Sequence, residues 1–271
     1  MALEATARRP LPPRRLSPDR IPGANPAPVP VGDNAVIVRR IGLSPFVAQF
    51  RIRADAPLSH VEPGQYLSLG LVVDGQLLQR PYSTATPAGI HDELEFLIRL
   101  VPNGAFTPRL WRLGVEDRLR VGRPKGLFTR IAGDRRTHVF IATGTGLAPF
   151  VAMLETMLRE PEAPRVVVIH GVAHAVELAY RERLERWAAE GRISYVPSIS
   201  RPADPSNHGW TGRAGRIDAI LDDVLVEHAL DSRHTVAYLC GNPAMIAAGA
   251  RILAAHGLSA DAIRSEHYWP A

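Results

Sequence analysis

Four consecutive residues, Arg80-Pro81-Tyr82-Ser83, place a cation, a flat ring and a small hydroxyl side by side. They read as an extended strand, in which alternation sends Arg80 and Tyr82 to one face and Ser83 to the other. A planar ligand that carries phosphate can use this set: a guanidinium for the phosphate, a ring to stack on, and a short donor for a polar edge. Pro81 cannot donate to a sheet, so the stretch should lie at a sheet edge or beside a ligand. Taken alone, a Tyr beside an Arg is more often a half-buried surface pair.

Two glycine-containing segments follow apolar stretches that read as strands. Thr-Gly-Thr-Gly at 143–146 comes after the stretch 139–142 and before an expected helix over 148–159. Glycines let a backbone approach a pyrophosphate closely, and a helix N-terminus offers free amides. Cys-Gly-Asn-Pro at 240–243 repeats the arrangement later in the chain. Both turns can therefore face one crevice beyond the carboxyl ends of a parallel sheet.

Arginines gather after another expected strand, 193–199. Ser200 and Arg201 end that strand, and Arg213 and Arg216 follow a loop rich in Pro, Gly and Asn. The guanidinium fork matches phosphate oxygens, so these residues suit an adenosine 2′-phosphate. Solvated surface arginines are the alternative.

The two halves of the chain predict different folds. From about 32 to 133, short apolar runs separated by Gly, Pro, Asn and Asp indicate an antiparallel sandwich or small barrel. From 137 onward, apolar strands alternate with helical patterns, which predicts a doubly wound, mostly parallel α/β domain. Its expected helices span 148–159, 176–189, 219–229 and 243–256, and its expected strands span 139–142, 165–170, 193–199, 236–240 and 263–268.

Composition excludes several classes of protein. The 271 residues include one cysteine, Cys240, so neither a disulfide framework nor a cysteine-based zinc or iron–sulfur site is expected. Residues 1–30 hold five arginines against Glu4 and Asp19, which is +3 of the net +5 and leaves +2 for the remainder. The nearly neutral remainder does not indicate nucleic-acid binding. No apolar run approaches the roughly 18 residues that span a bilayer, and a cytoplasmic location is expected.

Four separated motifs resemble the ferredoxin–NADP⁺ reductase family and occur in that family's order. They are Arg80-x-Tyr82-Ser83, the segment Val-Pro-Asn-Gly-Ala-Phe-Thr-Pro at 101–108, the turn at 144–146 and the turn at 240–243, followed by a terminal Glu266-x-Tyr268. The resemblance covers about 35 to 269 and is strongest to bacterial flavodoxin/ferredoxin reductases. It implies an antiparallel Greek-key β-barrel for FAD in residues 32–134 and a doubly wound parallel α/β domain for NADP in 135–271. Residues 1–31 would be a disordered or draped basic, proline-rich extension.

The resemblance also implies roles for individual residues. Arg80 would bind the FAD pyrophosphate, Tyr82 would stack on the isoalloxazine, and Ser83 would lie near its N5. The other FAD contacts that it implies are the backbone around Ile98 to Val101 and the residues Pro81, Ala105, Phe106, Thr107, Thr145, Tyr268 and Trp269. Those implied around NADP are Thr143, Gly144, Ser200, Arg201, Arg216, Cys240, Gly241 and Asn242. Ser83, Cys240 and Glu266 are the implied catalytic residues.

The implied activity is hydride transfer between nicotinamide C4 and flavin N5, coupled to one-electron exchange with ferredoxin or flavodoxin. The expected enzyme is a monomer that binds this carrier transiently, without a metal site or a membrane or nucleic-acid partner. Two alternatives stay open: an NAD(P)H-dependent free-flavin or ferric-siderophore reductase, and a non-catalytic binding protein on the same scaffold. One segment departs from the family's pattern: many relatives carry an arginine where this chain reads Gly171-Val172-Ala173-His174. Preference for NADP over NAD is therefore left open, although His174 could partly replace that guanidinium.

Overall fold

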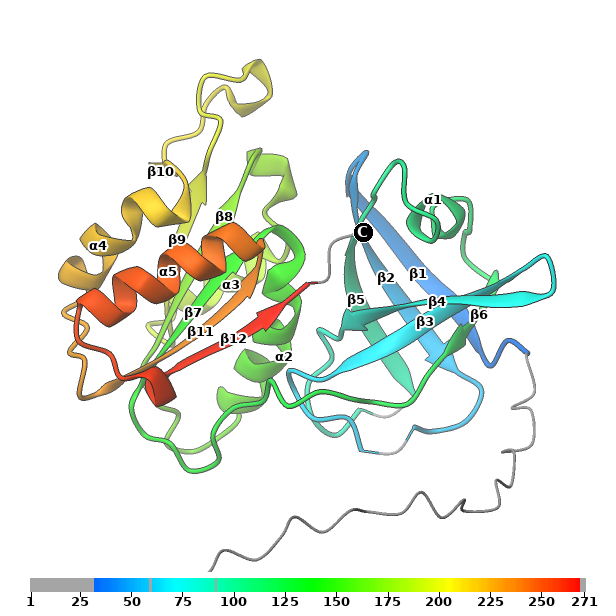
Figure 1. The fold of residues 1–271 in the computed structure, drawn as a ribbon, viewed down its shortest axis with the longest axis horizontal. Helices are drawn as coiled ribbons and strands as arrows, with labels where there is room; N and C mark the ends of the chain where they lie inside the picture. Colours follow the sequence, from blue (N-terminus) through cyan, green and yellow to red (C-terminus); the bar gives the residue numbers. More distant parts are fainter. Residues whose placement is uncertain (1–31, 59, 91, 269–271) are drawn as a thin grey trace, which may run out of the picture. The chain divides into compact units, whose positions relative to one another are not determined.

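The computed structural model describes residues 32–58, 60–90 and 92–268. Two six-stranded sheets follow one another along this part of the chain, the first antiparallel and the second parallel (Figure 1). This order of an antiparallel barrel and a doubly wound sheet confirms the fold class predicted from the two halves of the sequence. The extension expected over 1–31 and the aromatic Trp269 lie outside the described residues.

The antiparallel sheet has the spatial order β4-β3-β6-β1-β2-β5. Its elements are β1 (Ala35–Ser44), β2 (Val47–Ala54), β3 (Tyr66–Val73), β4 (Gln76–Ser83), β5 (Glu93–Arg99) and β6 (Arg118–Val121), with the short helix α1 (Thr107–Leu110) before β6. Just beyond the end of β4, Thr84 bridges to Phe96 on β5, and the Ala85 amide donates to the Glu95 carbonyl at 2.8 Å. This short bridge joins β4 and β5, the strands at the two ends of the spatial order, and closes the barrel.

Strand β4 is the edge strand that the proline predicts. It pairs only with β3 along its length, so Pro81 stands opposite Ser68 without interrupting a second ladder. Inside the barrel, every second residue of the strands is apolar and buried, as in Ile37, Phe50 and Phe96. Period-two burial of this kind is what places the intervening side chains outside, where a ligand can reach them.

The parallel sheet has the spatial order β10-β9-β8-β7-β11-β12. Its strands are β7 (Thr137–Thr143), β8 (Val166–Val172), β9 (Ser194–Ile199), β10 (Arg213–Ala214), β11 (Thr235–Gly241) and β12 (Ile263–His267), and its helices are α2 (Ala148–Met157), α3 (Arg181–Ala189), α4 (Ile217–Glu227) and α5 (Pro243–Ala255). The chain moves outward from β7 through β8 and β9, then returns to the other side of β7 as β11. The order therefore reverses between β7 and β11, which is where open α/β sheets bind ligands.

Alternate residues of β7 pack on opposite faces of this sheet. Phe140 and Ala142 join a cluster with α2 and α3, whereas Val139 and Ile141 join a cluster with α4 and α5. Figure 1 shows the two helix pairs on the two faces. Burial on both sides explains why the central strands read as continuous apolar runs in the sequence.

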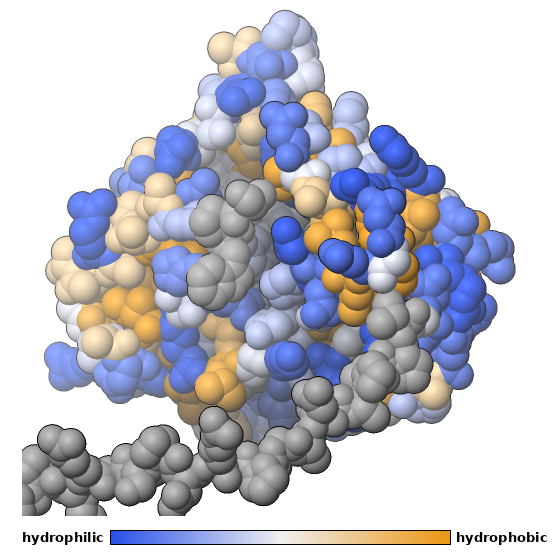
Figure 2. Space-filling view, turned by 45° about the vertical axis from the view of Figure 1, so that its right-hand side comes forward, coloured by the Kyte–Doolittle hydropathy of each residue, from blue (hydrophilic) through white to orange (hydrophobic). Residues whose placement is uncertain are grey.

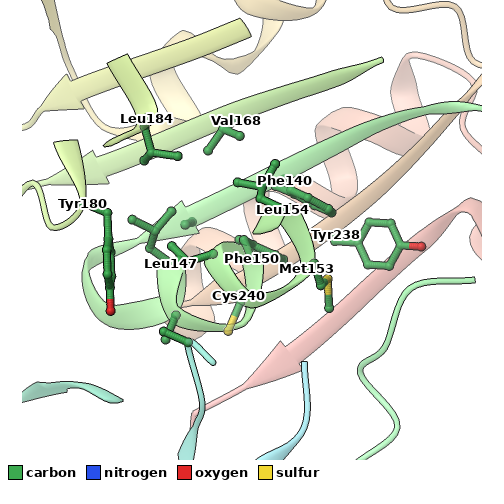
Figure 3. Packing of buried hydrophobic residues seen from close by; sticks show 14 of the residues in the cluster. Phe140, Leu147, Phe150, Met153, Leu154, Val168, Tyr180, Leu184, Tyr238 and Cys240 are labelled. Carbon is green, nitrogen blue, oxygen red and sulfur yellow. The ribbon is translucent and has the colours of Figure 1, made fainter. Parts of the chain in front are cut away.

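The first of these clusters also contains barrel residues. Val47, Leu97 and Phe128 pack with the side chains of α2 in one continuous core. Figure 3 shows its part around α2, β7 and β11, where the rings of Phe140 and Phe150 stack with centroids 4.8 Å apart. The barrel and the parallel sheet thus share apolar packing through α2.

One predicted helix is wrong. The expected helix over 176–189 is divided into a 3₁₀ turn, η2 (Ala175–Glu177), and α3, which begins at Arg181. Tyr180 between them has a φ of 58°, in the left-handed region, so a continuous helix cannot pass through it. Buried contacts of Leu178 and Tyr180 with two different clusters outweigh the helical pattern of the sequence here.

The surface of the described residues carries isolated apolar side chains. The large exposed ones are Phe46, Val72, Ile90, Val115, Leu127, Val176 and Val226. On the face seen in Figure 2, apolar residues form separate patches between hydrophilic ones. Within the described part of the chain, no helix has both the length and the apolar character needed to cross a bilayer.

Gly146 lies where the two glycine turns touch. A Cβ at this position would lie 2.3 Å from the Cys240 carbonyl oxygen and 2.7 Å from the Gly241 Cα, both backbone atoms that cannot move aside cheaply. We expect Gly146→Ala to lower the free energy of unfolding by about 1–3 kcal/mol, as overpacking generally does. Denaturant unfolding followed by circular dichroism measures the change. Gly42→Ala is the matched control, because a Cβ there would have no heavy atom within 4 Å; equal losses in both variants would contradict the proposed close approach.

Candidate functional site

A cavity with a volume of about 970 Å³ takes its walls from both sheets. The barrel contributes β4, β5 and the segment leading into α1, and the parallel sheet contributes β12 and the turn after β7. The residues facing it that the sequence singled out are Arg80, Pro81, Tyr82, Ser83, Val101, Ala105, Phe106, Thr107, Thr145, Glu266 and Tyr268. The structure thus gathers motifs separated by up to 188 residues into one site.

One wall combines a cation with aromatic rings. The rings of Tyr82 and Phe106 lie with centroids 5.8 Å apart at an angle of 37°. Arg80 is exposed, and its guanidinium donates only to the neighbouring Gln79 carbonyl, with no carboxylate partner among the described residues. Burial raises the pKa of Tyr82 above its usual range, against the opposing charge of Arg80. A neutral ring beside an uncommitted guanidinium can hold a flat group that carries phosphate.

A hydrogen bond between Ser83 and Glu266 joins the two sheets at this cavity. The Ser83 hydroxyl, 5 % exposed at the end of β4, donates to Oε2 of Glu266 on β12 at 2.8 Å. Burial raises the pKa of Glu266 above its ordinary value, and the bond from Ser83 opposes part of that rise. A carboxyl with a raised pKa at a cavity wall can hold a proton and release it locally.

Cys240 and Tyr268 are neighbours of this pair. Cys240 is opposite Glu266 in the β11–β12 register, and its thiol is fully buried. Burial, reinforced by the nearby Glu266 carboxylate, raises the pKa of Cys240, so the sulfur is a neutral thiol. The Tyr268 hydroxyl donates to the Thr145 carbonyl at 3.2 Å. This contact ties the segment after β12 to the first glycine turn.

The two glycine turns pack directly against each other, as their positions at strand ends predict. The Asn242 amide donates to Oγ1 of Thr143 at 2.8 Å, and Gly241 has a φ of 128°, which permits the approach. Gly144 also has a positive φ, 53°, and its carbonyl contacts Nε2 of the buried His170 at 3.0 Å. Burial lowers the pKa of His170 to about 4, so this ring is neutral and can donate to that carbonyl.

The arginine-rich segment forms a second, separate group at the carboxyl end of β9. Ser200, Arg201 and Arg216 are all exposed, and β10 pairs with β9 so that the chain before Arg216 runs beside the end of β9. Arg216 is paired with Asp218 at 3.1 Å, whereas Arg213 is paired with Glu227. None of these side chains faces the large cavity.

Ile98 does not face the cavity with its side chain. It is 1 % exposed inside the barrel, because alternation along β5 turns Leu97 and Arg99 to the cavity instead. The Arg99 side chain was not predicted to face the cavity, although its same-face spacing from Val101 was a usable signal. Arg99 lies 3.4 Å from Glu177, a carboxylate of η2 that is only 5 % exposed. The cavity therefore has two guanidinium groups, Arg80 and Arg99, on its barrel side.

The barrel and the parallel sheet each match a known family model. Residues 34–129 match the model of the oxidoreductase FAD-binding domain, and residues 140–251 match that of the oxidoreductase NAD-binding domain. Ferredoxin–NADP reductase B of Sorangium cellulosum is 33 % identical over 208 residues, covering 75 % of this chain and 84 % of the relative. The chain belongs to the ferredoxin–NADP⁺ reductase family.

A solved structure and a relative with a different name are also similar to this chain. A crystal structure of a ferredoxin–NADP⁺ reductase from Neisseria gonorrhoeae with bound FAD and NADP superposes with a TM-score of 0.74 at 25 % identity, covering 87 % of this chain and 98 % of that one. The anthranilate 1,2-dioxygenase electron transfer component of Acinetobacter baylyi is 36 % identical over 189 residues, but this chain matches only 52 % of it. Family membership therefore establishes an oxidoreductase whose cofactors are FAD and a nicotinamide dinucleotide. It does not identify the electron acceptor, because relatives with different names are similar to this chain.

The cavity fits the flavin that the family implies. Its volume lies within the range of ligand sites, about 300–1,000 Å³, and it offers aromatic faces, the arginines Arg80, Arg99 and Arg264, and the Ser83–Glu266 pair. These are the contacts that a flat ring with a polar edge and a diphosphate needs.

The raised pKa of Glu266 makes a pH-dependent prediction. Since its folded pKa lies above the ordinary value of about 4.5, folding favours the protonated carboxyl, and this contribution is lost as pH rises through the folded pKa. Glu266→Gln keeps the size of the side chain and an acceptor for Ser83 but cannot ionise. We expect the melting temperature of the variant, relative to the original protein, to increase from pH 4 to pH 8. A difference that stays constant over this range would show that Glu266 is not shifted.

Proposed function

We propose that this protein passes electrons between NADP(H) and a small one-electron carrier protein, ferredoxin or flavodoxin. The observation that carries the proposal is the Ser83–Glu266 hydrogen bond, formed across two sheets at a cavity that also contains Arg80 and Tyr82. Similarity to relatives named ferredoxin–NADP reductase supports the carrier. The proposed boundaries remain a barrel domain in 32–134 and a nicotinamide domain in 135–271.

The barrel residues would bind and orient the flavin. When bound, FAD supplies hydride exchange with the nicotinamide and single-electron exchange with the carrier. Arg80, with no carboxylate partner among the described residues, would hold the pyrophosphate, and Tyr82 would pack against the ring system. Val101, Ala105, Phe106 and Thr107 would line the path of the phosphates, where the Thr107 hydroxyl already accepts from the Val101 amide at 2.9 Å. Ile98 would contribute through its backbone.

Residues of the parallel sheet would orient the nicotinamide and exclude water. Thr143, Gly144, Gly241 and Asn242 belong to the paired turns, which would present their backbone to the dinucleotide. Cys240, fully buried and neutral, would lie beside these turns without adding charge to them. Glu266 would hold a proton beside Ser83. Tyr268 would cover the second face of the flavin site, and Ser200, Arg201 and Arg216 would bind the 2′-phosphate.

The decisive experiment follows the absorbance of the bound flavin. We expect FAD to remain with the protein through gel filtration, NADPH to bleach its spectrum, and ferredoxin or flavodoxin to accelerate the reduction of cytochrome c. Bleaching without acceleration by either carrier, with FAD lost on the column, would favour a free-flavin or ferric-siderophore reductase. A bound flavin that NADPH does not bleach would identify a non-catalytic binding protein.

Ser83→Ala tests the role of the polar pair. The substitution removes the donor to Glu266, a hydrogen bond to an ionisable group worth about 1.5–3 kcal/mol, so we expect flavin reduction by NADPH to slow by about 10–100-fold. Stopped-flow absorbance measures the rate, and the flavin content measures retention of FAD. Ser68→Ala, on the adjacent strand β3 and away from the cavity wall, is the control. An unchanged rate in Ser83→Ala would remove Ser83 from the mechanism.

A further inference from the structure

Asn207 is a buried amide in an otherwise exposed loop. The loop follows Arg201, and within it Asn207 ends the 3₁₀ turn η3 (Pro205–Asn207). Asn207 is only 3 % exposed, whereas its neighbours Ser206 and His208 are exposed. Burying a polar side chain costs free energy unless its donors and acceptors form hydrogen bonds.

The Asn207 amide is satisfied entirely by backbone groups from two strand ends. Its Nδ2 donates to the Arg201 carbonyl at 2.7 Å and to the Ala173 carbonyl at 3.3 Å. Its Oδ1 accepts from the Ala175 amide at 2.8 Å. Ala173 and Ala175 follow β8, and Arg201 follows β9. One side chain therefore joins the chain after β8 to the chain after β9.

A second set of contacts runs between the same two segments. Nδ1 of His174 lies 3.0 Å from the Ser206 hydroxyl, and that hydroxyl donates to Oδ1 of Asp204 at 2.7 Å. Because the Ser206 proton is committed to Asp204, His174 must be the donor to Ser206. His174 and Asn207 together hold the loop against the end of β8.

Arg201 depends on these contacts for its position. Arg201 is exposed, and its guanidinium makes no hydrogen bond or ion pair with the described residues. Its backbone carbonyl, in contrast, receives the Asn207 amide and the Asp204 backbone amide. The main chain of Arg201 thus sets the direction of its side chain. The side chain that bonds to this main chain is that of Asn207.

We infer that Asn207 is a positioning residue for recognition of the dinucleotide's 2′-phosphate. It fixes the backbone of Arg201 relative to the turn that bears His174, so that Ser200, Arg201 and Arg216 present their donors to one anion. The inference rests on the proposed function, because it assumes that these residues bind the phosphate. Asn207 itself does not touch the ligand.

The test replaces Asn207 with aspartate in the FAD-loaded protein. Asn207→Asp keeps the shape and the acceptor for Ala175 but turns an oxygen toward two carbonyls, which breaks both donated bonds. By calorimetry we expect 2′-phospho-AMP to bind at least about tenfold more weakly, with 5′-AMP affinity changed by less than about threefold. Amide hydrogen exchange should also accelerate at residues 200–202 and 173–175.

Asn34→Asp is the matched control. Asn34 also bridges backbone groups with its amide, accepting from the Val121 amide at 2.7 Å and donating to the Val121 carbonyl at 3.0 Å, but it lies in the barrel. It should leave both nucleotide affinities unchanged. If Asn207→Asp fails to fold, Asn207→Ala removes the same bonds without placing an oxygen against two carbonyls.

The outcomes separate the inference from the proposed function. If the original protein binds 2′-phospho-AMP no better than 5′-AMP, the arginine cluster is not a phosphate site and both proposals about it fail. If the original protein discriminates and Asn207 variants discriminate equally well, only the positioning role fails. Equal weakening of both nucleotides would show that Asn207 merely maintains the fold of the loop, and would also overturn the inference.

Discussion

The shared apolar core between the barrel and α2 is the constraint on which the site depends. Phe128 from the chain after β6 packs against Phe150 of α2 with ring centroids 5.9 Å apart, and Val47 and Leu97 join the same cluster. The walls of the cavity come from different sheets, so only a fixed relation between those sheets can bring Ser83 within 2.8 Å of Glu266. The hydrophobic effect supplies this relation without directional bonds, and close packing makes it specific.

Charge is distributed unequally over the cavity. On the barrel side, Arg80 and Arg99 are exposed or half-exposed guanidinium groups, suited to diphosphate oxygens. On the side of the parallel sheet, burial favours neutral forms, raising the pKa of both Glu266 and Cys240. The barrel side of the cavity thus offers guanidinium groups for an anion, whereas Glu266 on β12 can hold a proton because burial raises its pKa.

Much of this arrangement could be predicted from local patterns. The period-two burial of the barrel strands, the proline on an edge strand and the two glycine turns at strand ends all follow from short-range sterics and hydrogen bonding, and the structure confirms them. The helix expected over 176–189 was wrong because Tyr180 takes a left-handed conformation that its tertiary contacts impose. Local helix propensity does not predict such a contact, because the residues that Tyr180 packs against lie far away in the sequence.

The sequence alone therefore determined the class of the fold, the order of its two halves and the residue types of the site. Those properties depend on periodicity, turn chemistry and side-chain type, which neighbouring residues carry. Only the tertiary structure decided several contacts: that the Arg99 side chain faces the cavity, that Tyr268 donates to the Thr145 carbonyl, and that Asn207 joins two strand ends. These contacts depend on strand register and on the packing of α2, which place residues far apart in the chain within hydrogen-bonding distance.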